Sequence, residues 1–217
     1  MKFSLRIALL GMAALALLAQ CKKEEGKYAI AGKITHARTG EPLNGAAVNL
    51  QKKSVGGSVY SAAYTTAANT TTGSDGAYHM EFARENFGGL KLAAHYSQFI
   101  SREQELNVAG FDVGSTYNQS LSLYPEAFVQ VHFQHPSLAA SSDKIRFTFL
   151  NAQFDCVCCY EGYQEFAGVV DTTTTCKLYG DQWLKYRAIF THAEQDSTVV
   201  DSVYCPAFQT TQLLISY

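Results

Sequence analysis

The sequence predicts an all-β protein in which two β-sandwich domains follow an N-terminal export segment. Three observations support this fold class. Apolar and polar residues alternate with a period of two in many short segments, turns containing Gly, Pro or Asp separate these segments, and no long stretch rich in Leu, Glu, Lys and Ala follows residue 26. A strand with this alternation buries one face and exposes the other, as strands of a sandwich do.

The first twenty residues have the organisation of a secretion signal. Lys2 and Arg6 are followed by a mostly apolar run over residues 7–19, which has the length of a signal core and is shorter than the roughly twenty residues of a membrane-spanning helix. The run ends in Leu18-Ala19-Gln20-Cys21, which resembles a lipobox, although Gln20 replaces the usual small residue. The resemblance implies that residues 1–20 are removed and that Cys21 carries lipid, such as palmitate, that anchors the protein to the membrane. The alternative is an ordinary cleaved signal beside a chance cysteine.

Residues 21–26 form a charged tether after this signal. Within it, Lys23-Glu24-Glu25 resembles the surface-export signal of some Gram-negative lipoproteins. This resemblance implies an outer-membrane lipoprotein on the cell surface. The alternatives are a protein that faces the periplasm and a tether whose charges only keep it solvated.

Residues 27–124 contain the first set of predicted strands. Their alternating apolar positions include Tyr28, Ile30 and Ile34; Ala46, Val48 and Leu50; Tyr78, Met80 and Phe82; and Leu90, Leu92 and Ala94. Turns are expected at Gly40-Glu41-Pro42, Gly56-Gly57, Asp75-Gly76 and Gly88-Gly89 because these residues favour tight reversals.

Several short strings of this first segment resemble one known family. The strings are Ile30-Ala31-Gly32-Lys33-Ile34, Thr39-Gly40-Glu41-Pro42-Leu43, Gly45-Ala46-Ala47-Val48, and later Asp75-Gly76 with Tyr78. Together they are similar to the opening of carboxypeptidase regulatory-like domains, which are transthyretin-like sandwiches. The resemblance implies a transthyretin-like fold and an accessory or adhesive role. The His-x-x-Glu zinc pattern of the carboxypeptidase itself does not occur.

Residues 125–217 are predicted to form a second sandwich. Tyr124-Pro125 ends the last strand of the first set, expected over residues 119–123, because proline cannot continue a ladder of hydrogen bonds. Strands are then expected over residues 129–134, 144–149, 184–191, 197–204 and 210–217. Their spacing of about ten residues indicates an immunoglobulin- or fibronectin-like sandwich. The string Asp171-Thr172-Thr173 and the terminal Leu214-Ile215-Ser216-Tyr217 also resemble a C-terminal domain of bacterial lipoproteins.

Five cysteines follow Cys21, and all of them lie in the second segment: Cys156, Cys158, Cys159, Cys176 and Cys205. An exported protein can keep disulfides, and five thiols cannot all pair with one another. We expect at least one bond between the cluster at 156–159 and Cys176 or Cys205. The alternatives are buried reduced thiols and a metal site, although Cys-x-Cys-Cys does not have the spacing of a zinc site.

Neither catalysis nor nucleic-acid binding is indicated. The sequence has no Gly-x-Ser-x-Gly, His-Glu-x-x-His or Walker motif, and its net charge of −2 includes no basic stripe. The alternation places His79, His95 and His132 on exposed faces, and a hairpin between residues 77–82 and 90–95 would bring His79 diagonal to His95. We expect solvent-exposed histidines there, and no catalytic residue, metal or cofactor.

Tyr160 and Tyr163 are the candidate ligand contacts. They belong to an aromatic run with Phe154 and Phe166, and exposed tyrosines stack on sugars or anchor protein partners. The alternative is a loop that packs on the sandwich edge. The sequence thus favours a non-catalytic surface lipoprotein that acts as a binding or scaffold module. The alternatives are a carbohydrate-binding accessory protein of a glycan-uptake system and a periplasmic structural partner of a membrane complex.

Three tripeptides resemble acceptors of bacterial O-glycosylation. They are Asp171-Thr172-Thr173, Asp196-Ser197-Thr198 and Asp201-Ser202-Val203.

Overall fold

A computed structural model describes residues 26–56, 59–135, 142–151 and 162–216. The expected all-β sandwich fold is confirmed, since these residues form strands β1 to β15 and one short 3-10 helix, η1. Among the described residues there is no helix with the length and apolar character needed to cross a membrane.

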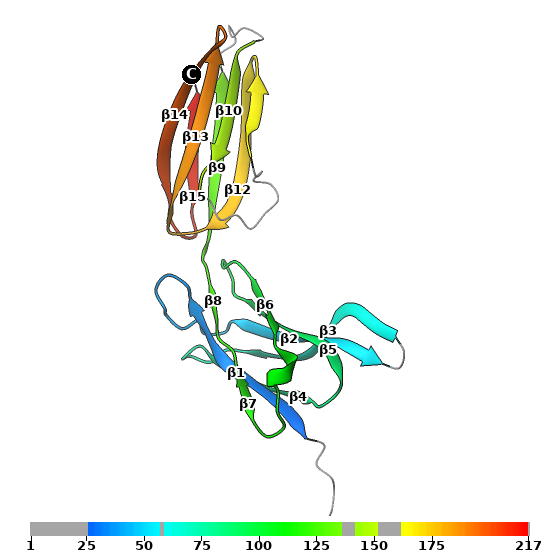
Figure 1. The fold of residues 1–217 in the computed structure, drawn as a ribbon. Helices are drawn as coiled ribbons and strands as arrows, with labels where there is room; N and C mark the ends of the chain where they lie inside the picture. Colours follow the sequence, from blue (N-terminus) through cyan, green and yellow to red (C-terminus); the bar gives the residue numbers. More distant parts are fainter. Residues whose placement is uncertain (1–25, 57–58, 136–141, 152–161, 217) are drawn as a thin grey trace, which may run out of the picture.

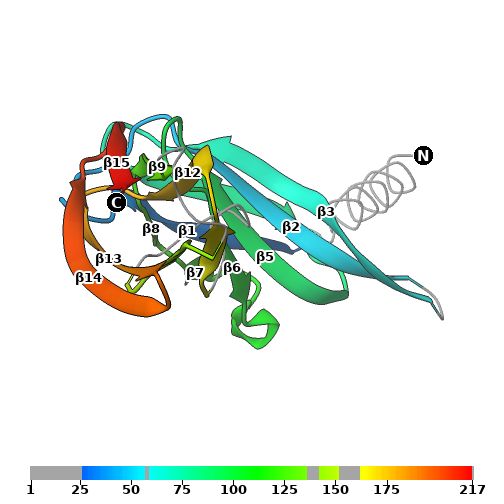
Figure 2. The same ribbon diagram turned by 90° about the horizontal axis from the view of Figure 1, so that it is seen from above.

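Two four-stranded sheets make up the first half of the chain. One sheet joins β4 (Ala77–Ala83), β1 (Lys27–His36), β7 (Thr116–Asn118) and β8 (Leu121–Leu123). The other has the order β3 (Val59–Thr71), β2 (Ala47–Gly56), β5 (Phe87–His95) and β6 (Arg102–Leu106), and η1 (Val108–Gly110) follows β6. Strand β1 is antiparallel to β4 and parallel to β7 and β8, whereas the pairs in the second sheet are antiparallel. The β2–β3 hairpin extends sideways in both views (Figures 1 and 2).

The two sheets share one apolar core. Ile30 of β1, Leu50 of β2, Leu92 of β5 and Leu123 of β8 are completely buried in it. Strand β1 can lie close to the segment before β8 only because position 32 is glycine: a Cβ there would lie 1.7 Å from the carbonyl oxygen of Gln119. Ile30, Leu50 and Leu92 were apolar positions of the predicted alternation, and all three are buried. The alternation thus also predicts which face of each strand packs inward.

The second half also contains two sheets. The larger has the order β11 (Gln164–Ala167), β10 (Lys144–Phe149), β13 (Gln182–His192) and β14 (Gln195–Cys205). The smaller has the order β12 (Val170–Tyr179), β9 (Glu126–His135) and β15 (Thr210–Ser216). All pairs are antiparallel except that of β15 with β9.

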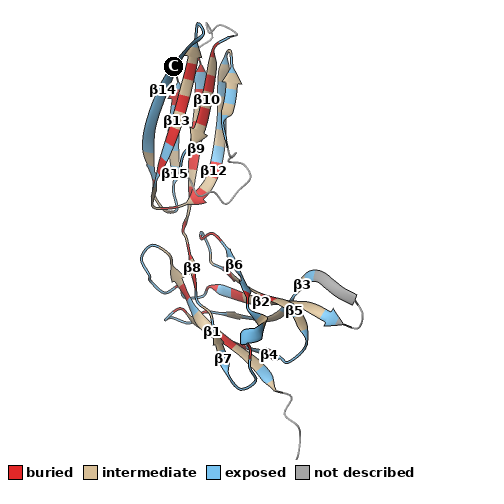
Figure 3. Ribbon diagram, viewed as in Figure 1, coloured by how far each residue is buried: buried red, intermediate tan, exposed pale blue. Residues whose placement is uncertain are grey.

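A separate apolar cluster fills the second sandwich. Phe133 and Phe147 come from opposite sheets, and their rings lie 5.2 Å apart in an edge-to-face arrangement. Figure 3 shows the buried residues inside each sandwich, while most of the edge strand β14 is exposed. The two sandwiches lie end to end and meet where β8 passes into β9 (Figure 1).

One turn expected in the first half is wrong, and one pairing that the sequence only suggested as a possibility does not occur. Gly88-Gly89 does not form a turn but lies inside β5, where Gly89 is opposite Lys53 of β2. Strands β4 and β5 do not pair as a hairpin either, because β4 pairs with β1 and β5 pairs with β2 and β6. His79 and His95 thus belong to different sheets, although both are exposed as expected.

Candidate binding surface on the second sandwich

The outer face of the sheet formed by β11, β10, β13 and β14 carries exposed aromatic side chains. On β13, Leu184 and Ala188 point into the core, so Trp183 and the alternate positions after it face outward. Trp183 lies opposite Tyr204 of β14, and their ring centroids are 5.5 Å apart at an interplanar angle of 51°. Their exposed fractions are 62% and 42%, which are high for large aromatic residues.

Polar contacts at the ends of the strands fix this aromatic pair. The hydroxyl group of Tyr204 donates to Oδ1 of Asp181 over 3.2 Å, and the same oxygen accepts from the backbone N–H of Ala207. Burial and then the Asp181 carboxylate raise the pKa of Tyr204. The Asn151 side chain donates to the carbonyl oxygen of Trp183 and accepts from the backbone N–H of Lys185. The rings are therefore presented on a rigid backbone.

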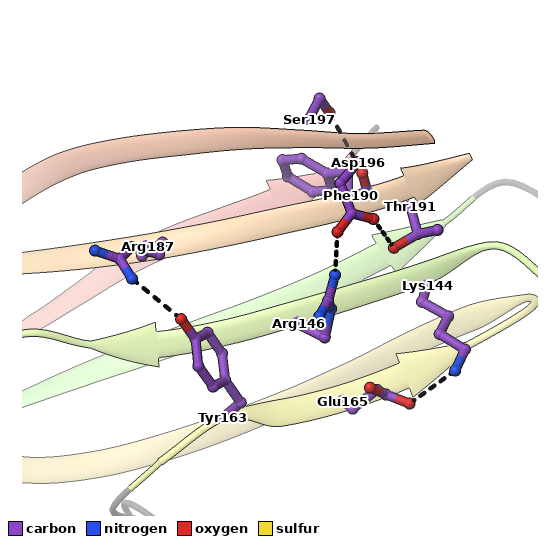
Figure 4. A network of polar contacts seen from close by, with 9 residues as sticks. All are labelled: Lys144, Arg146, Tyr163, Glu165, Arg187, Phe190, Thr191, Asp196 and Ser197. Carbon is purple, nitrogen blue, oxygen red and sulfur yellow. Dashed lines mark hydrogen bonds and ion pairs between the residues drawn. The ribbon is translucent and has the colours of Figure 1, made fainter. Parts of the chain in front are cut away.

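Tyr163, a residue that the sequence singled out, borders the same face. Its side chain is 49% exposed, and its hydroxyl oxygen accepts a hydrogen bond from Nη1 of Arg187 over 3.2 Å (Figure 4). Lys185 and Arg187 both face outward on β13, and neither forms an ion pair with another described residue. Two positive charges that no described carboxylate compensates thus lie between Tyr163 and the Trp183–Tyr204 pair.

The charges at the far end of this face are compensated. Arg146 of β10 pairs with Asp196 of β14 over 2.5 Å, and Lys144 pairs with Glu165 over 3.2 Å (Figure 4). Hydrogen bonds from Thr191 and then Arg146 lower the pKa of Asp196. The positive charge that is available to a ligand is therefore concentrated near Lys185 and Arg187.

The surface made of Tyr163, Trp183, Lys185, Arg187 and Tyr204, called the aromatic face below, also includes Val200, which is 47% exposed. Contiguous exposed apolar side chains mark interaction sites more often than scattered ones do. Of these residues, only Tyr163 was singled out from the sequence. Trp183 could have been added, because it directly precedes Leu184, an inward-facing position of the predicted strand.

Several predicted site residues lie outside the described residues. They are Cys21, Lys23, Glu24, Glu25, Cys156, Cys158, Cys159 and Tyr160. Within the described ranges, no group of three or more His, Cys, Asp and Glu side chains could hold a metal ion.

The two remaining cysteines have different states. Cys176 is disulfide-bonded, and its partner lies outside the described part of the chain. Cys205, which the sequence offered as a candidate for a disulfide, is a free thiol. It is completely buried in the second core, where burial raises its pKa.

Comparisons with known proteins reveal a distant likeness to solved structures. No family model and no curated protein matches the chain. The TIE protein of Bacillus anthracis is 8% identical, with a TM-score of 0.35, over 88% of this chain and 34% of its own. GBS52, the minor pilin of Streptococcus agalactiae, is 9% identical, with a TM-score of 0.33, over 87% and 94% of the two chains. The shaft pilin SpaA of Lactobacillus rhamnosus GG is 10% identical, with a TM-score of 0.32, over 88% and 97%. At these TM-scores the likeness assigns no function.

Proposed function

We propose that the protein is a non-catalytic lipoprotein of the outer membrane that is displayed on the cell surface and docks a protein partner through the aromatic face. The observation that carries this proposal is the exposed Trp183–Tyr204 pair on the same face of the sheet as Arg187. Trp, Tyr and Arg are the residues that most often dominate the binding energy of protein interfaces. An open sheet face with several exposed apolar side chains suits another protein surface better than a small molecule.

The position of the face in the molecule supports this role. Strand β1 begins at Lys27, at the end of the first sandwich far from the second (Figure 1). A tether from Cys21 to Lys27 spans at most about 20 Å at roughly 3.5 Å per residue. A lipid on Cys21 would therefore keep the first sandwich near the membrane and direct the second sandwich away from it.

A photo-crosslinking amino acid at position 183 tests the docking surface in intact cells. Position 212 is the matched control, because Gln212 is exposed on the strand β15 of the opposite sheet. We expect a discrete crosslinked protein from position 183 and none from position 212. Equal products from both positions, or none from either, would rule out this surface.

Two variants test the anchor and the display. Replacing Cys21 by Ser should release the protein from membranes or leave the precursor unprocessed, and acyl labelling should be lost. Replacing Lys23, Glu24 and Glu25 by Ala should abolish labelling by an antibody added to intact cells while the protein stays membrane-bound. An unlipidated wild-type protein, or equal surface labelling of the second variant, would contradict the respective part of the proposal.

The second candidate function is a carbohydrate-binding accessory role in glycan uptake. The exposed ring of Tyr163, held by Arg187, favours it, because aromatic rings beside hydrogen-bond donors suit sugars. Binding on a glycan array that is lost in Tyr160→Ala or Tyr163→Ala would support this candidate. A crosslinked protein at position 183, together with no array binding that depends on Tyr160 or Tyr163, would support the docking role instead.

A further inference from the structure

The junction between the two sandwiches is held by backbone hydrogen bonds. The N–H of Ile100 donates to the carbonyl oxygen of Tyr124 over 2.9 Å, and the N–H of Glu126 donates to that of Gln98 over 2.8 Å. Phe99 and Pro125 form a bridge between these two bonds. The segment that connects β8 to β9 is therefore fixed against the loop between β5 and β6.

A hollow of about 300 Å³ lies beside this segment. It is lined by Ile100, Ser101, Arg102, Ser122, Tyr124 and Tyr179. Tyr179 comes from β12 of the second sandwich, and the other lining residues come from the first half and the connection. The volume lies at the lower end of the range of about 300–1,000 Å³ for ligand pockets, so the hollow suits a ligand of one or two rings.

Aromatic rings form one wall of the hollow. The rings of Tyr124 and Tyr179 are stacked, with centroids 4.5 Å apart and an interplanar angle of 11°. The guanidinium group of Arg38 lies 5.2 Å from the centroid of the Tyr124 ring, and because Tyr179 covers one face of that ring, Arg38 lies over the other. The Tyr124 ring is thus covered on both faces.

The polar wall of the hollow is positively charged. Arg102 uses one of its five N–H donors for the carbonyl oxygen of Ser122, at 3.2 Å. Neither Arg102 nor Arg38 has a carboxylate within ion-pair distance among the described residues, and the nearby Glu126 is paired with Lys177. A planar guanidinium with free donors binds carboxylate or sulfate oxygens in a bidentate manner.

Two hydroxyl groups complete the lining. Oγ of Ser101 lies 2.9 Å from Nδ1 of His95, and Oγ of Ser122 lies 3.0 Å from Oγ1 of Thr35. Each hydroxyl is oriented by one neighbour and keeps a further donor or acceptor site for a ligand. An acidic sugar has groups that match this lining. Its hydroxyl groups suit the fixed serine hydroxyls, its apolar ring edge suits the tyrosine stack, and its anionic group suits the arginine.

We propose that this hollow binds a single anionic sugar ring, with its carboxylate or sulfate on Arg102 and its hydroxyl groups on Ser101 and Ser122. This inference does not depend on the docking role of the aromatic face. Because the lining comes from both sandwiches, a sugar that binds this arrangement of the two stabilises the junction.

Calorimetric titration of the mature protein tests the inference with three single-ring probes: galacturonate, galactose 6-sulfate and galactose. We expect galacturonate or galactose 6-sulfate to bind, and the comparison of the two shows whether carboxylate or sulfate is preferred. Arg102→Ala should weaken the binding of the preferred probe by about tenfold or more, because a hydrogen bond to a charged group is lost. Arg102→Lys keeps the charge but loses the planar fork of N–H donors. Its affinity for the preferred probe should therefore lie between those of the wild type and Arg102→Ala.

Arg84→Ala is the matched control, since Arg84 is exposed on the loop between β4 and β5 and does not line the hollow. It should bind the preferred probe like the wild type, and unfolding midpoints should show that both variants are folded. Three results would overturn the inference: no binding of either anionic probe, equal affinities of Arg102→Ala and Arg84→Ala, or binding of galactose as tight as that of the anionic probes.

Discussion

The ring of Phe99, which belongs to the first half of the chain, lies 5.4 Å from the ring of Phe208, which belongs to the second. Phe99 is buried and also contacts the rings of Tyr96 and His36. Phe208 is held by its own N–H, which donates to the carbonyl oxygen of Glu126, and it has a φ of 62°. This aromatic contact thus adds to the backbone bonds and to the Tyr124–Tyr179 stack at the junction of the two sandwiches.

Phe208→Ala should loosen the junction without unfolding either sandwich. An aromatic pair contributes only about 1 kcal/mol beyond the area it buries, and Phe208 is half exposed. We expect nearly unchanged unfolding midpoints and shorter, unequal rotational correlation times of the two halves in ¹⁵N relaxation. Phe208→Tyr, which keeps the ring, is the control. Equal correlation times in Phe208→Ala and wild type would show that the ring of Phe208 does not help to fix the junction.

The strands themselves were largely predictable because each buries one face. The predicted segments 184–191 and 197–204 lie inside β13 and β14, but the strands extend to Gln182–His192 and Gln195–Cys205. The missed ends meet in a two-residue turn at Ala193 and Glu194, whose φ values are 48° and 61°. The usual sequence signal for such a turn is Asn-Gly or Asp-Gly. Ala193-Glu194 lacks this signal, so the turn could not be predicted.

The candidate surfaces were less predictable because they depend on the register between strands. Tyr163 could be singled out as an aromatic residue between strands. The pairing of Trp183 with Tyr204 follows from the turn at residues 193–194, which fixes the register of β13 and β14. Similarly, Tyr124 and Tyr179 meet only because β12 and β9 pair over ten residues and end together. No local pattern in the sequence contains this information.

Replacing Ala193 by Asn and Glu194 by Gly should stabilise the second sandwich. Both positions have left-handed backbone conformations, which cost a non-glycine residue roughly 1–2 kcal/mol and which Asn and Gly tolerate better. We expect the free energy of unfolding to rise by about 1 kcal/mol in urea titrations followed by Trp183 fluorescence. Gln195→Gly is the control and should destabilise, because residue 195 begins β14. A lower stability of the double variant would contradict this account of the turn.

A fragment of residues 26–124 should fold by itself, with the β-type circular dichroism and cooperative unfolding of a sandwich. Its core cluster contains residues from 30 to 123 and none from the second half. A fragment that ends at residue 119 lacks β8 and therefore Leu121 and Leu123, which are buried. Each buried leucine contributes about 1.5–3 kcal/mol, so the shorter fragment should be several kcal/mol less stable. A molten 26–124 fragment would show that the halves form one cooperative unit.

The first sandwich should lose stability at alkaline pH because of Tyr78. Its side chain is 4% exposed, its hydroxyl group donates to the carbonyl oxygen of Gln119 over 2.6 Å, and burial raises its pKa well above the usual 10.0. A raised pKa means that the neutral form stabilises the fold below pH 10 and that this contribution falls progressively above it.

Urea unfolding between pH 8 and 11, followed by the amide signals of β4, measures this dependence. Tyr78→Phe should be less stable at pH 8 by about 1 kcal/mol, for loss of the hydrogen bond, and should lose less stability on going to pH 11. Parallel curves for wild type and variant would assign the alkaline dependence to other groups.

The cysteines of the second sandwich should differ sharply in reactivity. Cys176 is disulfide-bonded, and we expect its partner to be one of Cys156, Cys158 and Cys159, because Cys205 is a free thiol. Alkylation of non-reduced protein from the cell envelope, followed by peptide mapping, should link the peptide of Cys176 to that cluster. Cys205, which is completely buried, should be alkylated only after unfolding.

Cys176→Ser should lower the free energy of unfolding by roughly 2–4 kcal/mol, because the loop closed by the bond restricts the unfolded chain. The wild type in reducing agent should show a similar loss. Cys205→Ser is the matched control: it changes a buried thiol in the same core but leaves the bond intact, so reducing agent should still destabilise it. If Cys176 in envelope protein is alkylated without prior reduction, the bond does not form in the cell. The stability of the second sandwich would then depend on packing alone.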